Sequence, residues 1–98
     1  MQDQFQIVGR YQTEHALRYM GQLCKHFGHK VEARLEGDEG FVDFTSGTAR
    51  FMATEGELTV TLSASDQDAA ERLKPVIDSH LERFAFREDF KNMDWEGA

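Results

Sequence analysis

The sequence has one cysteine, one proline and no long hydrophobic run. Because Cys24 is the only cysteine, no disulfide can form within the chain, which is typical of proteins from a reducing compartment. Residues 1–5 (MQDQF) have neither a basic start nor an apolar stretch, so we expect no signal peptide. No apolar stretch approaches the roughly 20 residues that a membrane helix needs. These features predict a cytoplasmic protein without a membrane partner.

Basic charge is also scarce. The 98 residues include 11 lysines and arginines against 18 aspartates and glutamates, and the formal net charge is −7. An anionic surface repels phosphate backbones, and the few basic residues are dispersed, so we expect no nucleic-acid partner. Hydrophobic residues make up 40% of the chain, which is typical of a globular protein. This length suits one domain, residues 1–98, and is too short for two.

Alternation of apolar and polar residues predicts strands. The alternation is clearest over 57–64, where Leu58, Val60 and Leu62 are separated by polar residues. The predicted strands cover residues 5–11, 31–36, 41–44, 48–53 and 57–64. Short turns separate the last four of them, which implies antiparallel neighbours. A further short strand is predicted around Met93 and Trp95, which also alternate.

Helical spacing of apolar residues predicts two helices. The first follows Thr13, which can cap it, and ends at Gly28 in a left-handed turn. The second begins at Ser65 or Asp66 and runs to about residue 84. Pro75 lies inside it and predicts a kink, or alternatively a division into two helices.

The order of these elements predicts the fold class. A sheet with one solvated face and two helices on the other satisfies every amphipathic segment. The predicted fold is α+β, a two-layer sandwich of an antiparallel sheet of four to five strands with two helices on one face.

The sequence contains no known catalytic or phosphate-binding motif. Its four histidines are His15, His26, His29 and His80. On the first predicted helix, Tyr19 shares a stripe with His15 and His26 along the border of the apolar face, where a half-open pocket would have its polar lining. An ordinary amphipathic border with side-chain tips in water is the favoured interpretation.

The segment 24–29 (CKHFGH) looks like a compressed metal-binding motif. Cys24 and His26 point to different sides of a helix, and His26 meets His29 only if the chain turns back at Gly28. A metal site also needs a third or fourth ligand. Cys24, His26 and His29 are therefore weak metal candidates, and a small buried apolar side chain is the favoured interpretation of Cys24. No cofactor is identified.

His80 lies near the middle of the apolar face of the second predicted helix. A buried histidine must be neutral or paired, so a core histidine bonded to a backbone carbonyl or a carboxylate is the favoured interpretation. The alternative is a histidine at the floor of a pocket, poised near neutral pH. Arg83 and Arg87, four residues apart, could bind an anion, although pairing with carboxylates of this acidic chain is favoured.

Two stretches, residues 18–30 (RYMGQLCKHFGHK) and 80–88 (HLERFAFRE), followed by Trp95, resemble the small bacterial domain-of-unknown-function family number 2218. The resemblance spans nearly the whole chain and implies no activity, substrate or cofactor. Related domains are fused to siderophore-interacting, flavin-dependent reductases, which implies a role near iron acquisition and a siderophore-reductase partner. The two stretches contain the candidate ligand-binding residues Tyr19, His26, His29, His80, Arg83 and Arg87.

Three functions remain in competition. The first is a non-catalytic binding or accessory module that uses the candidate residues to hold a small ligand, a metal chelate or a partner. The second is a homodimer formed through the weakly charged side of strand 57–64, which presents Thr59, Thr61 and Ser63. The third is a small enzyme that uses histidine acid–base chemistry.

Overall fold

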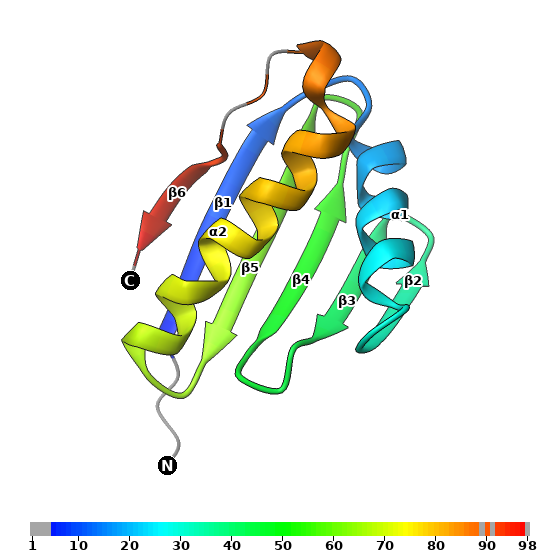
Figure 1. Ribbon diagram of the computed structural model, residues 1–98. Helices are drawn as coiled ribbons and strands as arrows, with labels where there is room; N and C mark the ends of the chain where they lie inside the picture. The colour runs from blue at the N-terminus through cyan, green and yellow to red at the C-terminus, as the bar shows by residue number, and fades with distance from the viewer. Residues whose placement is uncertain (1–4, 89, 91, 98) are drawn as a thin grey trace.

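The computed structural model describes residues 5–88, 90 and 92–97. Its elements follow in the order β1 (Phe5–Gln12), α1 (Ala16–Phe27), β2 (Glu32–Glu36), β3 (Glu39–Asp43), β4 (Thr48–Ala53), β5 (Glu57–Ala64), α2 (Gln67–Phe84), the short 3-10 helix η1 (Phe86–Glu88) and β6 (Asp94–Gly97). The strands form one antiparallel sheet in the order β2-β3-β4-β5-β1-β6. Both helices lie on the same face of it, α1 toward β2 and α2 across β5 and β1 (Figure 1). The predicted α+β sandwich is confirmed.

The sheet has six strands, where four to five were expected, because the C-terminal residues pair with the free edge of β1. Trp95 of β6 lies opposite Gly9. A Cβ atom at Gly9 would come within 2.6 Å of the Trp95 ring, so only glycine allows this approach. The predicted tail strand around Met93 and Trp95 therefore exists and starts at Asp94.

Asp78 on α2 holds this last strand in place. Its Oδ1 accepts a hydrogen bond from the Met93 backbone N–H at 3.0 Å, and its Oδ2 accepts one from the Trp95 indole N–H at 2.9 Å. One carboxylate thus ties the helix layer to the C-terminal edge of the sheet.

The hydrophobic core fills the space between the sheet and the helices. Along β5 the buried and half-buried residues alternate strictly, with Leu58, Val60 and Leu62 facing the helices. This alternation fixes the register, because a shift of one residue would expose every one of these side chains. The core partners on the helices include Met20, Leu23, Leu73, Ile77 and Leu81.

The structure confirms some of the predicted helix ends and corrects others. Asp66 caps α2 by accepting a hydrogen bond from the Ala69 backbone N–H at 2.8 Å, as predicted. The predicted cap at Thr13 is wrong, because the N-cap of α1 is His15, which makes no side-chain cap hydrogen bond; the Thr13 hydroxyl instead accepts a hydrogen bond from the His15 backbone N–H at 3.1 Å and closes the turn that leads into α1. Gly28 does end α1, but its φ of −63° is right-handed, so the predicted left-handed turn is wrong.

Pro75 lies within an uninterrupted α2, and the division into two helices is therefore wrong. A proline in a helix interior costs about 3 kcal/mol. Leu73, Ile77 and Leu81 are buried around it, and burying each such side chain is worth about 1.5–3 kcal/mol, which outweighs that cost. Among the described residues, no helix is long and apolar enough to cross a membrane.

Candidate functional site

The packing of α1 beside α2 brings two predicted site residues together. His26 near the end of α1 and His80 on α2 stand with their ring centroids 4.8 Å apart. Both side chains are half-buried at the junction of the two helices. Their proximity could not be predicted from spacing, because it depends on how the helices cross the sheet.

The two histidines line a cavity of about 210 Å³, which we call the His26–His80 pocket. This volume lies below the roughly 300–1,000 Å³ of pockets for drug-sized ligands, so the pocket suits a ligand of about one ring. Its remaining lining residues are Phe27, Lys30, Val31, Phe44 and Val76.

Aromatic rings form a continuous array beside this pocket. Phe27 packs edge-to-face on Phe44 at 5.0 Å between ring centroids and lies 4.8 Å from the His80 ring. Beyond His80, the array continues through His26 to Phe84, at 6.3 Å. Aromatic pairs favour these tilted arrangements at 4.5–7 Å, so a further ring can join the array without disturbing it.

The ring of His80 has a defined hydrogen-bonding role. Its Nδ1 lies 2.7 Å from the Val76 carbonyl oxygen, so this nitrogen carries the proton and donates it to the carbonyl. In the neutral ring Nε2 is then an acceptor, and no described residue donates a hydrogen bond to it. The predicted bond to a backbone carbonyl is present, but the ring is half-buried at a pocket wall instead of lying fully within the core.

Basic neighbours set the charge state of His26. Burial lowers its pKa below the ordinary value of 6.5, and the nearby His80, Arg83, Lys30 and His29 lower the pKa further. The ring is therefore neutral at neutral pH. No described residue makes a hydrogen bond to it, so it is available to a ligand.

The other predicted candidates lie elsewhere. His29, Arg83 and Arg87 are exposed, and the Arg87 guanidinium rests 5.6 Å from the ring centroid of Phe86. Of these three, Arg83 and His29 contribute to the lowered pKa of His26. Tyr19 is 2% exposed and belongs to a different polar cluster.

The positions of Cys24, His26 and His29 do not support the metal site suggested by the sequence. Cys24 is buried against Gly40, where a Cβ atom would meet its Sγ at 2.7 Å, and burial raises the pKa of the thiol. His29 is exposed. Within residues 5–88, 90 and 92–97, no three metal-binding side chains gather in one place.

A second polar cluster was not anticipated from the sequence. The Glu88 carboxylate accepts hydrogen bonds from the Tyr11 hydroxyl at 2.6 Å, from the Thr13 hydroxyl at 2.9 Å and from the Tyr19 hydroxyl. Burial alone would raise the pKa of Glu88, but these three bonds outweigh burial and leave the pKa below its ordinary value. Burial, with Glu88 beside them, raises the pKa of both tyrosines, so the phenols stay protonated and donate.

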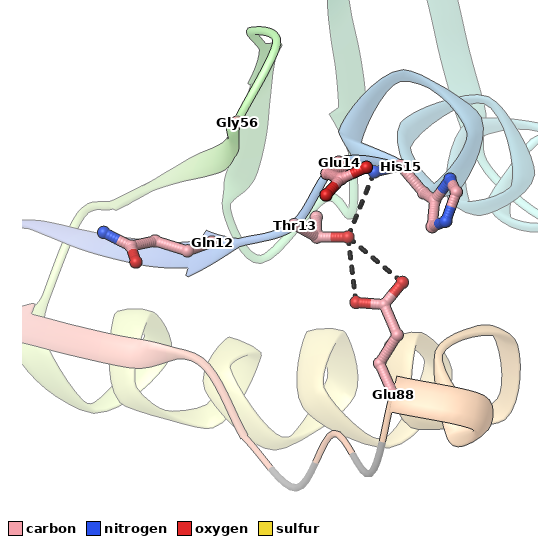
Figure 2. Close-up of a pocket in the computed structure, with 6 residues that line it drawn as sticks. All are labelled: Gln12, Thr13, Glu14, His15, Gly56 and Glu88. Atoms are coloured by element: carbon pink, nitrogen blue, oxygen red, sulfur yellow. Dashed lines mark hydrogen bonds between the residues drawn. The ribbon is translucent and has the colours of Figure 1, made fainter.

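This cluster lies beside an open cavity of about 470 Å³. Figure 2 shows Thr13 between the His15 backbone and Glu88, with Gln12, Glu14 and Gly56 around them. Three hydroxyl groups already donate hydrogen bonds to the carboxylate of Glu88. The arrangement ties η1 to β1 and α1, which is a structural role, whereas His26 and Nε2 of His80 offer unoccupied nitrogens.

The fold and the junction of the helices define a small α+β domain with one ring-sized pocket between its helices. A family model described as an uncharacterized protein conserved in bacteria (DUF2218) matches residues 8–96, and the chain belongs to this family. The NMR structure of PA4090 from Pseudomonas aeruginosa is 33% identical in sequence, with a TM-score of 0.79, and the match covers 94% of this chain and 95% of that one. A search of curated proteins found no match.

Proposed function

We propose that this protein is a non-catalytic binding module that holds a small ring-containing ligand in the His26–His80 pocket. The carrying observation is the meeting of two imidazoles, 4.8 Å apart, at the wall of an apolar cavity of about 210 Å³. Ligand sites are concave and mostly apolar, with a few polar groups that fix orientation. The pocket has this composition, and its histidine nitrogens are the polar groups.

A titration followed by protein NMR tests the proposal. Small single-ring compounds, such as benzamide and benzoate, should shift the backbone amides of residues 26–31, 44 and 76–80 with one saturating curve. The variant Val76→Phe places a ring where the ligand would lie and should abolish these shifts. Val8→Phe makes the same change at a half-buried valine on the opposite face of the sheet and should leave binding intact. Saturable shifts that survive in Val76→Phe would place the binding site elsewhere.

A link to iron and siderophore use is a finer proposal, which rests on the resemblance to domains fused to siderophore-interacting reductases. In this proposal the ligand would be a catechol-bearing ring, and a siderophore reductase would be the partner. Adding 2,3-dihydroxybenzoate and its ferric complex to the same titration tests the link. Binding no tighter than that of benzoate would argue against it.

Association of two copies is a second candidate function. No helix or strand of the described residues covers the face of the sheet opposite α1 and α2, and Thr59, Thr61 and Ser63 are half-exposed along its centre. These three side chains are uncharged, with Arg10 and Arg50 beside them on the neighbouring strands, and such a surface can pack against a copy of itself about a two-fold axis. Sedimentation equilibrium of the wild type and of Thr61→Lys tests this candidate. A wild-type monomer at high concentration would exclude it.

A further inference from the structure

The charged groups around the His26–His80 pocket are positive, whereas the net charge of the protein is negative. The chain carries a formal net charge of −7, yet no carboxylate lines the pocket among the described residues. Lys30 forms part of the lining, and Arg83 and His29 act electrostatically on His26. The charged and titratable groups that surround a ligand in this position are therefore basic.

The lining itself selects the shape of the ligand. Phe27, Phe44 and the two imidazoles present ring faces and edges, and Val31 and Val76 complete an apolar wall. A flat ring gains the tilted aromatic contacts already used along this array. The volume of about 210 Å³ suits one ring.

We propose that the ligand is a single-ring aromatic carboxylate, whose ring enters the aromatic array and whose carboxylate pairs with a protonated His26. This inference rests on the proposed function and names the class of ligand. The exposed Lys30, at the rim of the pocket, places a second positive charge near the carboxylate of the ligand. The free Nε2 of His80 is left as an acceptor for a hydroxyl group on the ring.

Binding of such an anion takes up a proton. The groups that face His26 are His80 and Arg83 from α2, together with His29 and Lys30 from the end of α1 and the following loop. All of them disfavour a charge on the ring, so His26 is neutral in the free protein at neutral pH. A ligand carboxylate beside the ring favours the protonated form of His26 and so raises the pKa of His26.

The direction of the pH dependence follows from this proton uptake. The affinity for the anion is lowest above the pKa that His26 has in the complex. It rises as the pH falls through that value and levels off below the lower pKa of the free protein. An uncharged ring of the same shape gains nothing from protonation, so its affinity does not rise in this range.

A divalent metal ion is the other ligand that paired imidazoles attract. Here the site would contribute two nitrogens and no carboxylate among the described residues, with Arg83 and Lys30 repelling the ion. The anion is the ligand that these charges favour.

The test is a calorimetric titration with benzoate and with benzamide, which has the same ring without the charge, at about pH 5.5 and about pH 8. A charged hydrogen-bond partner should make benzoate about tenfold tighter than benzamide at the lower pH, and the ratio should shrink at the higher pH. His26→Gln should remove the pH dependence for benzoate. Lys30→Met should weaken benzoate about threefold more than it weakens benzamide, whereas the matched Lys25→Met, on the exposed side of α1, should change neither.

The outcomes separate this inference from the proposed function. If benzoate and benzamide bind with equal affinity at both pH values, and Val76→Phe still prevents the binding of both, the proposal that the ligand is an anion is refuted. The proposed ring-binding function would then remain. If neither compound binds, the proposed function fails and the inference fails with it. A benzoate preference that still grows as the pH falls in His26→Gln would overturn the role of His26.

Discussion

Removing the Asp78 carboxylate should loosen the C-terminal strand. Asp78→Ala deletes the acceptor for two N–H donors, the Met93 backbone and the Trp95 indole, at 3.0 and 2.9 Å. A hydrogen bond to a charged group contributes about 1.5–3 kcal/mol. Because Asp78 is half-buried, we take the low end for each of the two bonds and expect a loss of about 3 kcal/mol in the free energy of unfolding. For a domain of this size, that lowers the Tm by roughly 12–24 °C.

Trp95 is the only tryptophan in the chain, so its fluorescence reports directly on the docking of β6. Denaturant unfolding should show the loss of stability, and the native emission of Asp78→Ala should shift to longer wavelength as the indole becomes hydrated. Asp78→Asn keeps one acceptor oxygen and should fall between the wild type and Asp78→Ala. Glu82→Ala, an exposed carboxylate on the same helix, should stay within about 0.5 kcal/mol of the wild type. An Asp78→Ala protein with unchanged emission and stability would refute this account of β6.

Three further predictions follow from the packing and the pKa shifts. Gly9→Ala puts a methyl group within 2.6 Å of the Trp95 ring and should cost about 1–3 kcal/mol in denaturant unfolding, whereas Gly56→Ala meets nothing within 4 Å and should be neutral; equal effects would contradict the close approach. Glu88 has a folded pKa below its ordinary value of 4.5, so its contribution to stability is present above that value and is lost as the pH falls through the lowered one. Glu88→Gln should flatten this acid limb of the stability–pH curve, and an unchanged limb would exclude the hydroxyl cluster as its cause. His26 also has a lowered folded pKa, so stability is highest above 6.5 and declines as the pH falls below it; His26→Gln should remove that decline, and its persistence would assign it to another group.

The fold could be predicted largely from the sequence, because its core elements carry strong local patterns. The period of two over β5 and the cap at Asp66 each reflect a local rule, and the structure follows both. The strand β6 was harder to predict, since its pattern consists of little more than Met93 and Trp95. Its stability comes from Gly9 and Asp78, which lie far away in the sequence.

The candidate site could be predicted only in part. Helical spacing placed His26 on the border of α1 and His80 on the apolar side of α2, and both line the pocket. Spacing cannot show that the rings meet, because the distance depends on how α1 and α2 pack on the sheet. The same limit explains why the bonds from Tyr11 and Tyr19 to Glu88 were missed, since no local rule connects residues 77 and 69 positions apart.

The most direct test of the pocket is a proton–nitrogen NMR spectrum of the histidine rings during titration with benzoate. The chain has four histidines, and His15 lies at the open cavity beside Glu88, where it serves as an internal control. We predict that the ring nitrogens of His26 and His80 shift together with one saturating curve, that His26 moves toward the protonated form, and that His15 does not respond. Unchanged His26 and His80 resonances at saturating benzoate would contradict the account.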